Sequence, residues 1–422
     1  MKSLNYQSNR NEVENILKNR NFEIEEDLRK KVKDILLDVK SNGNKAIVEY
    51  TLRFDKVELT ELKVKKDELD EADELVEKDF YDSLDKAIKN IRSFHKKQRK
   101  ESWFDNNDGK ITGQLINPIK RVGCYVPGGG AAYPSSAMMT VIPAQVAGVE
   151  EIVVTTPPDK SGKINPYTLA TLKKLGVKEI YKIGGAQAIA ALAYGTESID
   201  SVMKIVGPGN IYVTIAKKEV YGKVDIDMLA GPSEVMILAD EKAKPKYIAA
   251  DLLSQAEHDP RAISVFASPS SSLIEEVKLE LNKQLKTLTR EEIARKSLND
   301  NGLLLKVRDI EEGLELVNNY GPEHFELLTK EPMTYLGKIK NAGAIFLGEY
   351  SPEPLGDYFA GPNHVLPTGG TAHYASPLST DDFSKKSSLI YYNQSELEKN
   401  SEDIARLARL EGLDAHARAI EI

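Results

Sequence analysis

The stretch EEIVVTTPPDKSGKINPYTLATLKKLGVKEIYKIGGAQAIAALAYG, from Glu150 to Gly195, decides the fold class. Residues 150–158 and 178–185 contain short apolar runs that are typical of buried strands. Between them, residues 165–176 form a helical pattern with proline in the first turn and glycine after the end. A second helical pattern follows at 186–195. Strands and helices that alternate in this way predict a parallel sheet covered by helices.

The alternation extends in both directions along the chain. A third predicted strand, SVMKIVGPGN from Ser201, precedes a helix, and the pattern resumes from VMILAD to AGAIFLGEY. We therefore expect an α/β fold with two Rossmann-like but incomplete parallel-sheet domains, extended by helices at both ends. The expected divisions are an N-terminal helical arm (1–25), a first domain (26–120 plus 234–380), a second domain (121–233) and a C-terminal helical tail (381–422).

Composition narrows the function classes. The 422 residues carry a formal net charge of −8, which argues against a general nucleic-acid binder because phosphate contacts need a basic surface. No apolar run has the length of a membrane span, and the first residues lack the apolar core of a signal peptide. The only cysteine, Cys124, excludes an intrachain disulfide and a multi-cysteine zinc site. We expect a cytoplasmic protein in which this cysteine is a small buried hydrophobe.

Most of the histidines lie in unusual surroundings. Five of the six are in short segments dense in glycine, proline and carboxylates, namely His258, His324, His364, His373 and His416. Histidine is the side chain that titrates near neutrality, and it is the commonest metal ligand. For any single one, a helix cap or a satisfied loop is the simpler interpretation. Together they predict a site built from loops.

Several of these histidines have metal-ligand partners nearby. Gln255 and His258 are three apart at the end of a predicted helix, so they share a face. Asp357 and His364 flank the loop LGDYFAGPNH, and His416 lies in the predicted C-terminal helix. Two histidines, one aspartate and one amide oxygen suit zinc, or another borderline ion such as cobalt or manganese. No HExxH motif is present, so the common zinc-protease arrangement is excluded.

An acid and an imidazole stand next to each other at Glu323 and His324, between a predicted helix and a predicted strand. In a turn both side chains can face one cleft, where they could serve two separate proton transfers. The alternative is a surface helix terminus at which Pro322 sets the turn.

Glycine-rich turns follow four predicted or possible strands, at residues 126–136, 183–189, 206–210 and 229–234. Glycine allows a ligand to approach the backbone closely, and the free N–H groups of a helix start favour phosphate. None of the turns matches GxGxxG, since Tyr133 and Tyr212 occupy the place of the third glycine. A nucleotide site and ordinary α/β turn chemistry both remain open.

Taken together, these motifs closely resemble the histidinol dehydrogenase family. The matching stretches run in the family's order from Arg121 to the C-terminus: RVGCYVPGGGAAYPSS, IGGAQAIAALAYGT, IVGPGNIYV, DMLAGPSE, DLLSQAEHDP, YGPEHFEL, GAIFLGEYSPEPLGDYFAGPNHVLPTGGTA and EGLDAHARAI. The resemblance implies a zinc-requiring enzyme that oxidises L-histidinol to L-histidine through an enzyme-held aldehyde, the last step of histidine biosynthesis. It implies one Zn²⁺ per subunit and two NAD⁺ per histidinol.

The resemblance also implies roles for individual residues. The metal ligands would be Gln255, His258, Asp357 and His416, the last donated across a homodimer by the tail. The proton acceptors would be Glu323 and His324. The residues in contact with substrate would be Ser233, Gln255, His258, His324, Asp357, His364, Glu411 and His416. The residues in contact with NAD would be Tyr125, Gln187 and Asn210, so the second domain would bind NAD and the first would hold the metal and catalytic loops.

Two other function classes compete with this interpretation. A metal-dependent hydrolase would use the same ligands with Glu323 activating water directly, but it has no need of nucleotide-like turns. A non-catalytic metal-binding protein would tolerate Glu323→Gln and His324→Asn. The role of the zinc is also open, between placing the substrate's imidazole and amine and acting as a Lewis acid at its alcohol.

Overall fold

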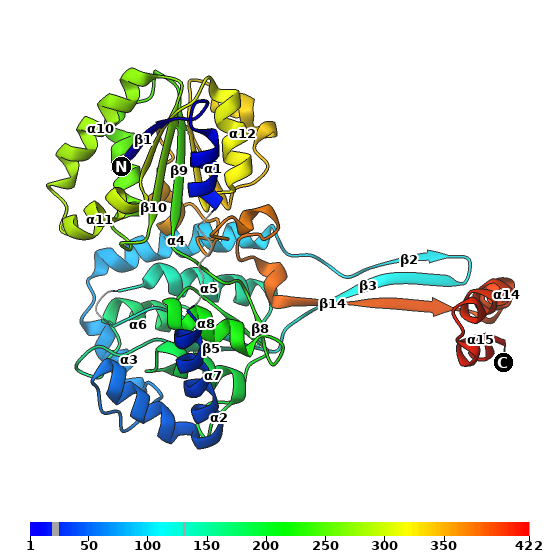
Figure 1. The fold of residues 1–422 in the computed structure, drawn as a ribbon. Coiled ribbons are helices and arrows are strands. Elements are labelled where there is room, and N and C mark those ends of the chain that lie inside the picture. Colours follow the sequence, from blue (N-terminus) through cyan, green and yellow to red (C-terminus); the bar gives the residue numbers. More distant parts are fainter. Residues whose placement is uncertain (19–24, 130–131, 422) are drawn as a thin grey trace.

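The computed structural model describes residues 1–18, 25–129 and 132–421. Figure 1 shows two α/β units, one above the other, and an arm that projects from them and ends in two helices at the C-terminus. Each unit contains one sheet whose strands are all parallel. The predicted α/β class with two parallel sheets is confirmed. Residues 19–24 of the expected N-terminal arm, Gly130 and Ala131 of the first glycine-rich turn and the last residue of the expected tail lie outside the described residues.

The first sheet has six strands and is covered by helices on both faces. Helices α9–α11 pack on one face, and α1 and α12 pack on the other. The strands in spatial order are β1 (Lys2–Asn5), β11 (Leu303–Lys306), β10 (Ile263–Ser268), β9 (Glu234–Ala239), β12 (His324–Leu328) and β13 (Ala344–Leu347). The helices are α1 (Arg10–Lys18), α9 (Pro245–Ala256), α10 (Ser271–Leu285), α11 (Glu291–Asn301) and α12 (Ile310–Tyr320).

The second sheet has five strands and is also covered on both faces. Its order is β6 (Glu179–Tyr181), β5 (Glu151–Thr155), β4 (Arg121–Tyr125), β7 (Lys204–Val206) and β8 (Asp225–Ile226). One face carries α2 (Glu26–Asp55), α7 (Gly185–Tyr194) and α8 (Ile211–Val220). The other carries α3 (Lys66–Glu74), α4 (Lys78–Lys96), α5 (Pro134–Ala147) and α6 (Pro166–Lys174).

The packing assigns two segments differently from the expected divisions. We expected residues 26–120 to belong to the first unit, but α2–α4 bury their apolar stripes against the second sheet, with Ile47 and Ile91 fully buried there. Residues 2–5, expected in a helical arm, instead form β1 at one edge of the first sheet. A stripe of apolar residues shows that a helix must pack, and it does not say on which sheet.

The arm is a three-stranded antiparallel sheet that carries the C-terminal helices. Its strands are β2 (Trp103–Asn107), β3 (Lys110–Pro118) and β14 (Ser384–Tyr392), followed by α14 (Gln394–Leu410) and α15 (Asp414–Glu421). We expected residues 381–422 to be helical, so β14 is a correction. Its nine residues, SKKSSLIYY, pair with β3 along its whole length, and that pairing with a distant segment overrides the local charged composition.

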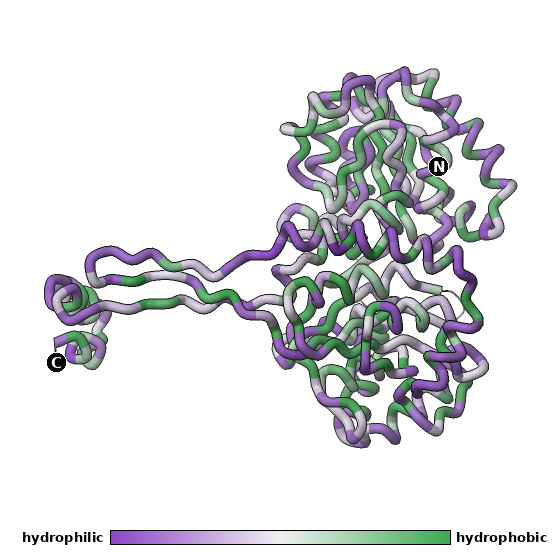
Figure 2. Tube along the Cα trace, turned by 180° about the vertical axis from the view of Figure 1, so that it is seen from behind, coloured by the Kyte–Doolittle hydropathy of each residue, from purple (hydrophilic) through white to green (hydrophobic). Residues whose placement is uncertain are grey.

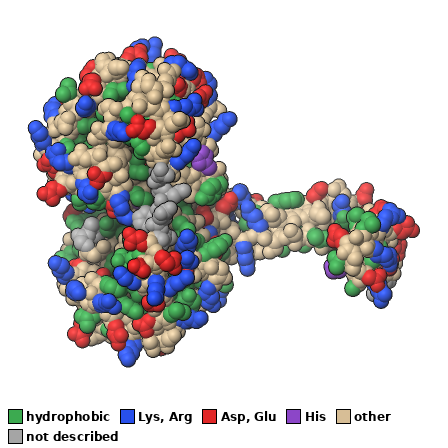
Figure 3. Space-filling model, viewed as in Figure 1, with side chains coloured by type: hydrophobic (Ala, Val, Ile, Leu, Met, Phe, Trp, Pro, Cys, Tyr) green, Lys and Arg blue, Asp and Glu red, His purple; other side chains and the backbone are tan. Residues whose placement is uncertain are grey.

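The arm buries little of its own apolar surface. No residue of β2, β3 or β14 is buried. Trp103, Phe104 and Ile390 are 56%, 68% and 72% exposed, and hydrophobic stretches recur along the arm in Figure 2 and at its surface in Figure 3. Exposed apolar surface of this kind is typical of a contact with another molecule.

Three short 3₁₀ helices and one α-helix complete the described part of the chain: Pro332–Lys338, Thr371–His373, Thr380–Phe383 and α13 (Glu353–Tyr358). No described helix combines the length and the apolar character that crossing a bilayer requires.

Candidate functional site

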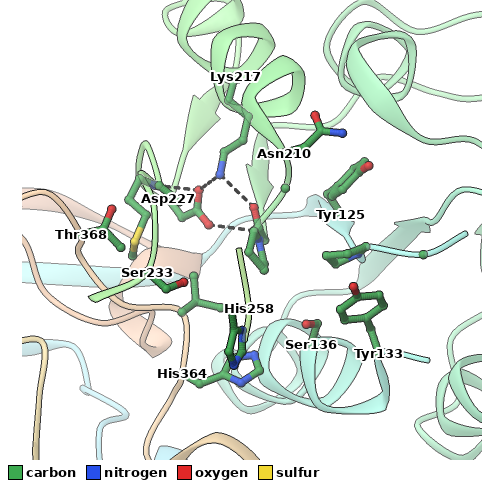
Figure 4. A pocket seen from close by; sticks show the side chains of 18 of the residues that line it. Tyr125, Tyr133, Ser136, Asn210, Lys217, Asp227, Ser233, His258, His364 and Thr368 are labelled. Atoms are coloured by element: carbon green, nitrogen blue, oxygen red, sulfur yellow. Dashed lines mark hydrogen bonds and ion pairs between the residues drawn. The ribbon is translucent and has the colours of Figure 1, made fainter. Parts of the chain in front are cut away.

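A cavity of about 750 Å³ receives residues from both units. Every predicted site residue before residue 411 lines it, and Figure 4 shows several of them around the opening. These are Tyr125, Gln187, Asn210, Ser233, Gln255, His258, Glu323, His324, Asp357 and His364. The last two predicted site residues are exposed at the far end of the arm (Figure 1), where Glu411 directly follows α14 and His416 lies in α15, and they do not line this cavity within the same chain.

The two units face the cavity with opposite ends of their strands. In the second unit, Tyr125 ends β4, and the turns with Gly184 and Gly207 follow β6 and β7. The carboxyl ends of these strands therefore face the cavity, which is where open α/β sheets bind ligands. In the first unit, Ser233 precedes β9 and His324 begins β12. The catalytic candidates therefore lie at the amino ends of the first sheet, which the usual rule for ligand sites does not predict.

His324 is held in one orientation inside the cavity wall. Its Nδ1 lies 3.1 Å from the backbone oxygen of Glu234, so Nδ1–H donates there and Nε2 is left without a partner, 3.7 Å from Asp357 Oδ1. Burial disfavours the charged ring. The carboxylates of Glu323, Glu353 and Asp357 outweigh that effect and raise the pKa of His324 well above its ordinary value. Without a bound cation, these carboxylates therefore favour the protonated ring, and its Nε2 is directed at the acidic centre of the cavity.

Glu323 is buried beside it. Its Oε2 accepts a hydrogen bond from the backbone N–H of Glu234 at 2.8 Å and lies 3.7 Å from His324 Nδ1. Burial raises the pKa of Glu323 to about 8, because a carboxylate is poorly solvated there. A glutamate poised near neutrality can take a proton from water, which is what a general base in a hydration step needs.

A group of metal-ligand side chains lies in the same wall. Single ligand atoms of His258, Glu353 and Asp357 all lie within 4.8 Å of one another. Gln255 is fully buried, and both atoms of its amide lack a hydrogen-bond partner. A buried amide without a partner is costly, so a ligand or ion is expected to satisfy it. Imidazole, carboxylate and amide donors at one place fit zinc.

The protonation states of His258 and Asp357 favour cation binding. His258 is exposed to solvent, yet the surrounding protein lowers its pKa by desolvation and favours the neutral, ligating form. Burial opposes the charge of Asp357, but His324, His364 and His258 outweigh it and lower the pKa of Asp357. His364 donates from Nδ1 to the backbone oxygen of Asp357 at 3.1 Å, and its Nε2 is buried without a partner.

Glu353 is the residue of this group that the sequence analysis missed. It begins α13, the short helix that also holds Asp357 one turn later. Positions i and i+4 of a helix share a face, so the spacing in SPEPLGD could have indicated that both acids point to one place. The glycines and proline of LGDYFAGPNH instead favour a loop, and this composition hides the helical spacing.

Further buried carboxyl groups lie behind Glu353. Glu326 is fully buried and accepts a hydrogen bond at Oε1 from the backbone N–H of Glu353 at 3.2 Å. Burial raises the pKa of Asp251 to about 6 and that of Glu353 to about 7. Burial and the neighbouring acids Asp251 and Glu353 raise the pKa of Glu326 well above its ordinary value.

The free energy of unfolding should fall as the pH rises through about 6, because Asp251 holds its proton in the folded protein and gives it up near pH 4 when unfolded. A carboxyl group with a raised folded pKa stabilises the fold below its unfolded pKa, and this contribution is lost above its folded pKa. Asp251 should account for roughly 1–2 kcal/mol of loss between pH 5 and pH 8. Urea unfolding at both pH values measures this. The free energy of unfolding of Asp251→Asn should decrease between pH 5 and pH 8 by roughly 1–2 kcal/mol less than that of wild type. An equal loss in both proteins would contradict the assignment, and exposed Asp34→Asn is the control.

The side of the cavity that the second unit forms is built from close backbone approaches. Gly207 has φ +115°, and a Cβ there would lie 2.1 Å from the backbone oxygen of Tyr125, so only glycine fits. Asp227 Oδ2 accepts from Gly207 N–H at 2.7 Å, and the Lys217 ammonium bonds both Asp227 Oδ1 and the Gly207 oxygen (Figure 4). This buried ion pair holds the turn after β7 in place.

The three predicted NAD residues surround these turns. The Tyr125 hydroxyl accepts from Gly185 N–H at 3.1 Å, and Gln187 is buried with its Oε1 unpartnered. Asn210 caps α8, since its Oδ1 accepts from the backbone N–H groups of Tyr212 and Val213. Asn210 therefore has a structural role whether or not it also touches a ligand.

Cys124 is fully buried in β4, and burial raises the pKa of its thiol to about 12. The expectation of a small buried hydrophobe is confirmed, and a thiolate nucleophile at this position is excluded.

Comparison with known proteins gives consistent matches. The family model described as histidinol dehydrogenase matches residues 18–422. Histidinol dehydrogenase of Halalkalibacterium halodurans is 56% identical over 93% of this chain and 92% of its own length, and that of Bacillus subtilis is 56% identical over 94% and 93%. The crystal structure of histidinol dehydrogenase from Elizabethkingia anophelis is 38% identical and superposes with a TM-score of 0.93, covering 97% of this chain and 95% of that one.

Proposed function

This chain belongs to the histidinol dehydrogenase family, and from that membership we propose how its cavity carries out the reaction. The enzyme uses NAD and zinc to oxidise L-histidinol to L-histidine, the last step of histidine biosynthesis. The observation that carries our assignment of roles is the adjacent buried pair Glu323 and His324, which stands beside the metal-ligand group in one cavity.

His324 takes the hydroxyl proton of histidinol as the first hydride leaves for NAD. The bond from its Nδ1–H to the Glu234 carbonyl fixes the ring, so Nε2 is the atom that accepts the proton. Among the described residues Nε2 forms no hydrogen bond, so it is available to the hydroxyl of the substrate. A positioned base of this kind contributes about 10²–10⁴-fold to a proton-transfer step.

Glu323 then acts as the base that activates water to attack the aldehyde, and the hydrate loses the second hydride. The Glu234 N–H holds one oxygen of Glu323, which leaves the other to orient water. Two oxidations with a hydration between them need more than one proton acceptor, and this adjacent pair supplies both. Because the pKa of Glu323 lies near 8, the aldehyde step should quicken as the pH rises through that value.

Zinc bound by Gln255, His258 and Asp357 would place the substrate's imidazole and amine. Its positive charge would also offset the negative charge of Glu323, Glu353 and Asp357 around His324. Ser233 and His364 line the same part of the cavity and would contact the substrate. The unpartnered Nε2 of His364 is suited to a polar group of the substrate.

The fourth ligand would come from a second copy of the chain. His416 and Glu411 are exposed at the end of an arm that covers little of its own apolar surface, which supports a homodimer in which each arm reaches the other subunit's cavity. In this dimer Glu411 would meet an ammonium or imidazole of histidinol. The single cysteine supports our further proposal of a cytoplasmic location.

A metal analysis combined with a histidinol-dependent assay of reduced nicotinamide tests this function. The purified protein should contain about one zinc per subunit, and absorbance of NADH should appear only with both histidinol and NAD. Two NADH should form for each histidine produced. A protein that binds zinc and hydrolyses an ester or amide, with no NADH from histidinol, would instead be the metal-dependent hydrolase.

A further inference from the structure

We propose that Asp55 binds the ribose diol in the adenosine half of NAD and makes the site select NAD over NADP. The inference rests on the proposed function in one respect, that this cavity receives NAD. It adds a subsite and a basis for cofactor choice that the roles of Tyr125, Gln187 and Asn210 do not contain.

The first observation is a carboxylate that the protein itself leaves unsatisfied. Asp55 is the last residue of α2 and lines the cavity. Its Oδ2 is buried and accepts no hydrogen bond, and no cation of the described residues pairs with it. A carboxylate is also disfavoured at a helix C-terminus, where the macrodipole is negative. Both the missing partner and the helix macrodipole make this position of the carboxylate unfavourable in the ligand-free protein. Unfavourable positions of this kind are typical of residues that bind a ligand.

The surroundings of Asp55 place it at the adenosine end. Asp55 comes from the second unit, together with Ile35 and Phe54, which also line the cavity. The two proposed proton acceptors, Glu323 and His324, belong to the first unit. Hydride must leave next to His324, so the nicotinamide lies there and the other half of the dinucleotide extends toward the second unit. Phe54 is 49% exposed and offers an apolar edge for the adenine.

A second unsatisfied acceptor, Gln187 Oε1, lies in the first turn of α7, the helix that follows β6. Gln187 Oε1 is buried without a partner and lies 2.8 Å from the place where a Cβ on Gly185 would stand. The Gly185 N–H already donates to the Tyr125 hydroxyl, and Tyr125 feels the charge of Asp55. Two buried acceptors without donors call for a ligand that brings donors. The two hydroxyls of a ribose do so, and a carboxylate can accept both.

The same charge would reject a 2′-phosphate. The only lysine or arginine among the described residues that line the cavity is Lys217, and its ammonium is taken up by Asp227 and the Gly207 oxygen. The guanidinium of Arg53 lies over the ring of Phe54, 5.5 Å from its centre, and does not line the cavity. A 2′-phosphate would remove the donor of the 2′-hydroxyl, leave only the 3′-hydroxyl to bond Asp55, and bring its negative charge against an unpaired carboxylate.

The test is direct binding by calorimetry to Asp55→Asn, without turnover, using ADP-ribose, nicotinamide mononucleotide, NAD and NADP as separate probes. Hydrogen bonds to a charged group predict that ADP-ribose binds about 10- to 100-fold more weakly to the variant. Nicotinamide mononucleotide should bind as to wild type, and the preference for NAD over NADP should fall. Asp34→Asn, which removes an exposed charge from the same helix, should change none of these constants.

Thermal unfolding without ligand separates binding from a structural role. Removing an unsatisfied carboxylate should leave the melting temperature unchanged or raise it. A lower melting temperature with equal losses of affinity for all four probes would show that Asp55 only supports the fold. An unchanged dissociation constant for ADP-ribose would overturn the subsite. If wild type bound neither NAD nor ADP-ribose, the proposed function itself would fail.

Discussion

Replacing His324 with asparagine is expected to slow the first oxidation by about 10²–10⁴-fold, because the proton acceptor is lost while the polar contact is kept. Asparagine can still donate toward the Glu234 carbonyl, so the amino end of β12 should keep its geometry. The step from aldehyde to histidine should be much less affected, since Glu323 remains. Single-turnover formation of NADH from histidinol, and separately from the aldehyde, measures the two steps.

Glu323→Gln should show the opposite pattern, with the aldehyde step slowed and the first oxidation retained. In wild type the aldehyde step should rise with pH through about 8, because burial keeps Glu323 protonated below that value. The variant should lose this pH dependence, since glutamine does not titrate. His373→Asn and Glu331→Gln are matched controls, because both residues are exposed and lie outside the cavity lining. Equal slowing of both steps by both substitutions would contradict two separate bases.

The periodicity of the chain was enough to predict the α/β class and the turns of the second unit. Its strands are short apolar runs bounded by glycine, so the carboxyl ends with Tyr125, Gly184 and Gly207 could be located without coordinates. The same reasoning could not locate His324 at the amino end of β12. Long-range packing sets the order of the strands in a sheet and which of their ends face the cavity. The spacing of residues along the chain does not predict either.

The buried acids show a similar limit. Asp251, Glu326 and Glu353 come from α9, β12 and α13, and only the folded chain brings them together beneath His324. In the sequence each is an ordinary acid in an amphipathic or polar segment. Asp55 is a stronger case, because nothing in TLRFDKVEL distinguishes it from a helix-end acid on the surface. Only the folded structure shows that Oδ2 of Asp55 is buried without a hydrogen-bond partner.

Removing the residues after Ser401 is expected to abolish both zinc retention and activity while the two α/β units stay folded. The deleted segment holds Glu411 and His416, and it buries only Ala405 and Ala417 among its described side chains, so the cores of both units lose nothing. Zinc would keep only Gln255, His258 and Asp357 from one chain. Loss of one ligand from a tetrahedral site should lower metal affinity greatly. Metal content, activity and circular dichroism measure the three properties.

Mixing two inactive variants decides whether the tail acts within its own chain or across the dimer. A His416→Asn subunit has an intact cavity and lacks the ligand on its tail, whereas a His324→Asn subunit has an intact tail and a defective cavity. If the tail reaches the partner, a mixed dimer contains one site with both parts intact. Refolding the two variants together in equal amounts should then restore activity at about a quarter of all sites, because half of the dimers are mixed. If each tail served its own cavity, mixing would restore nothing, and a truncated protein that kept full activity with zinc bound would remove the tail from the site altogether.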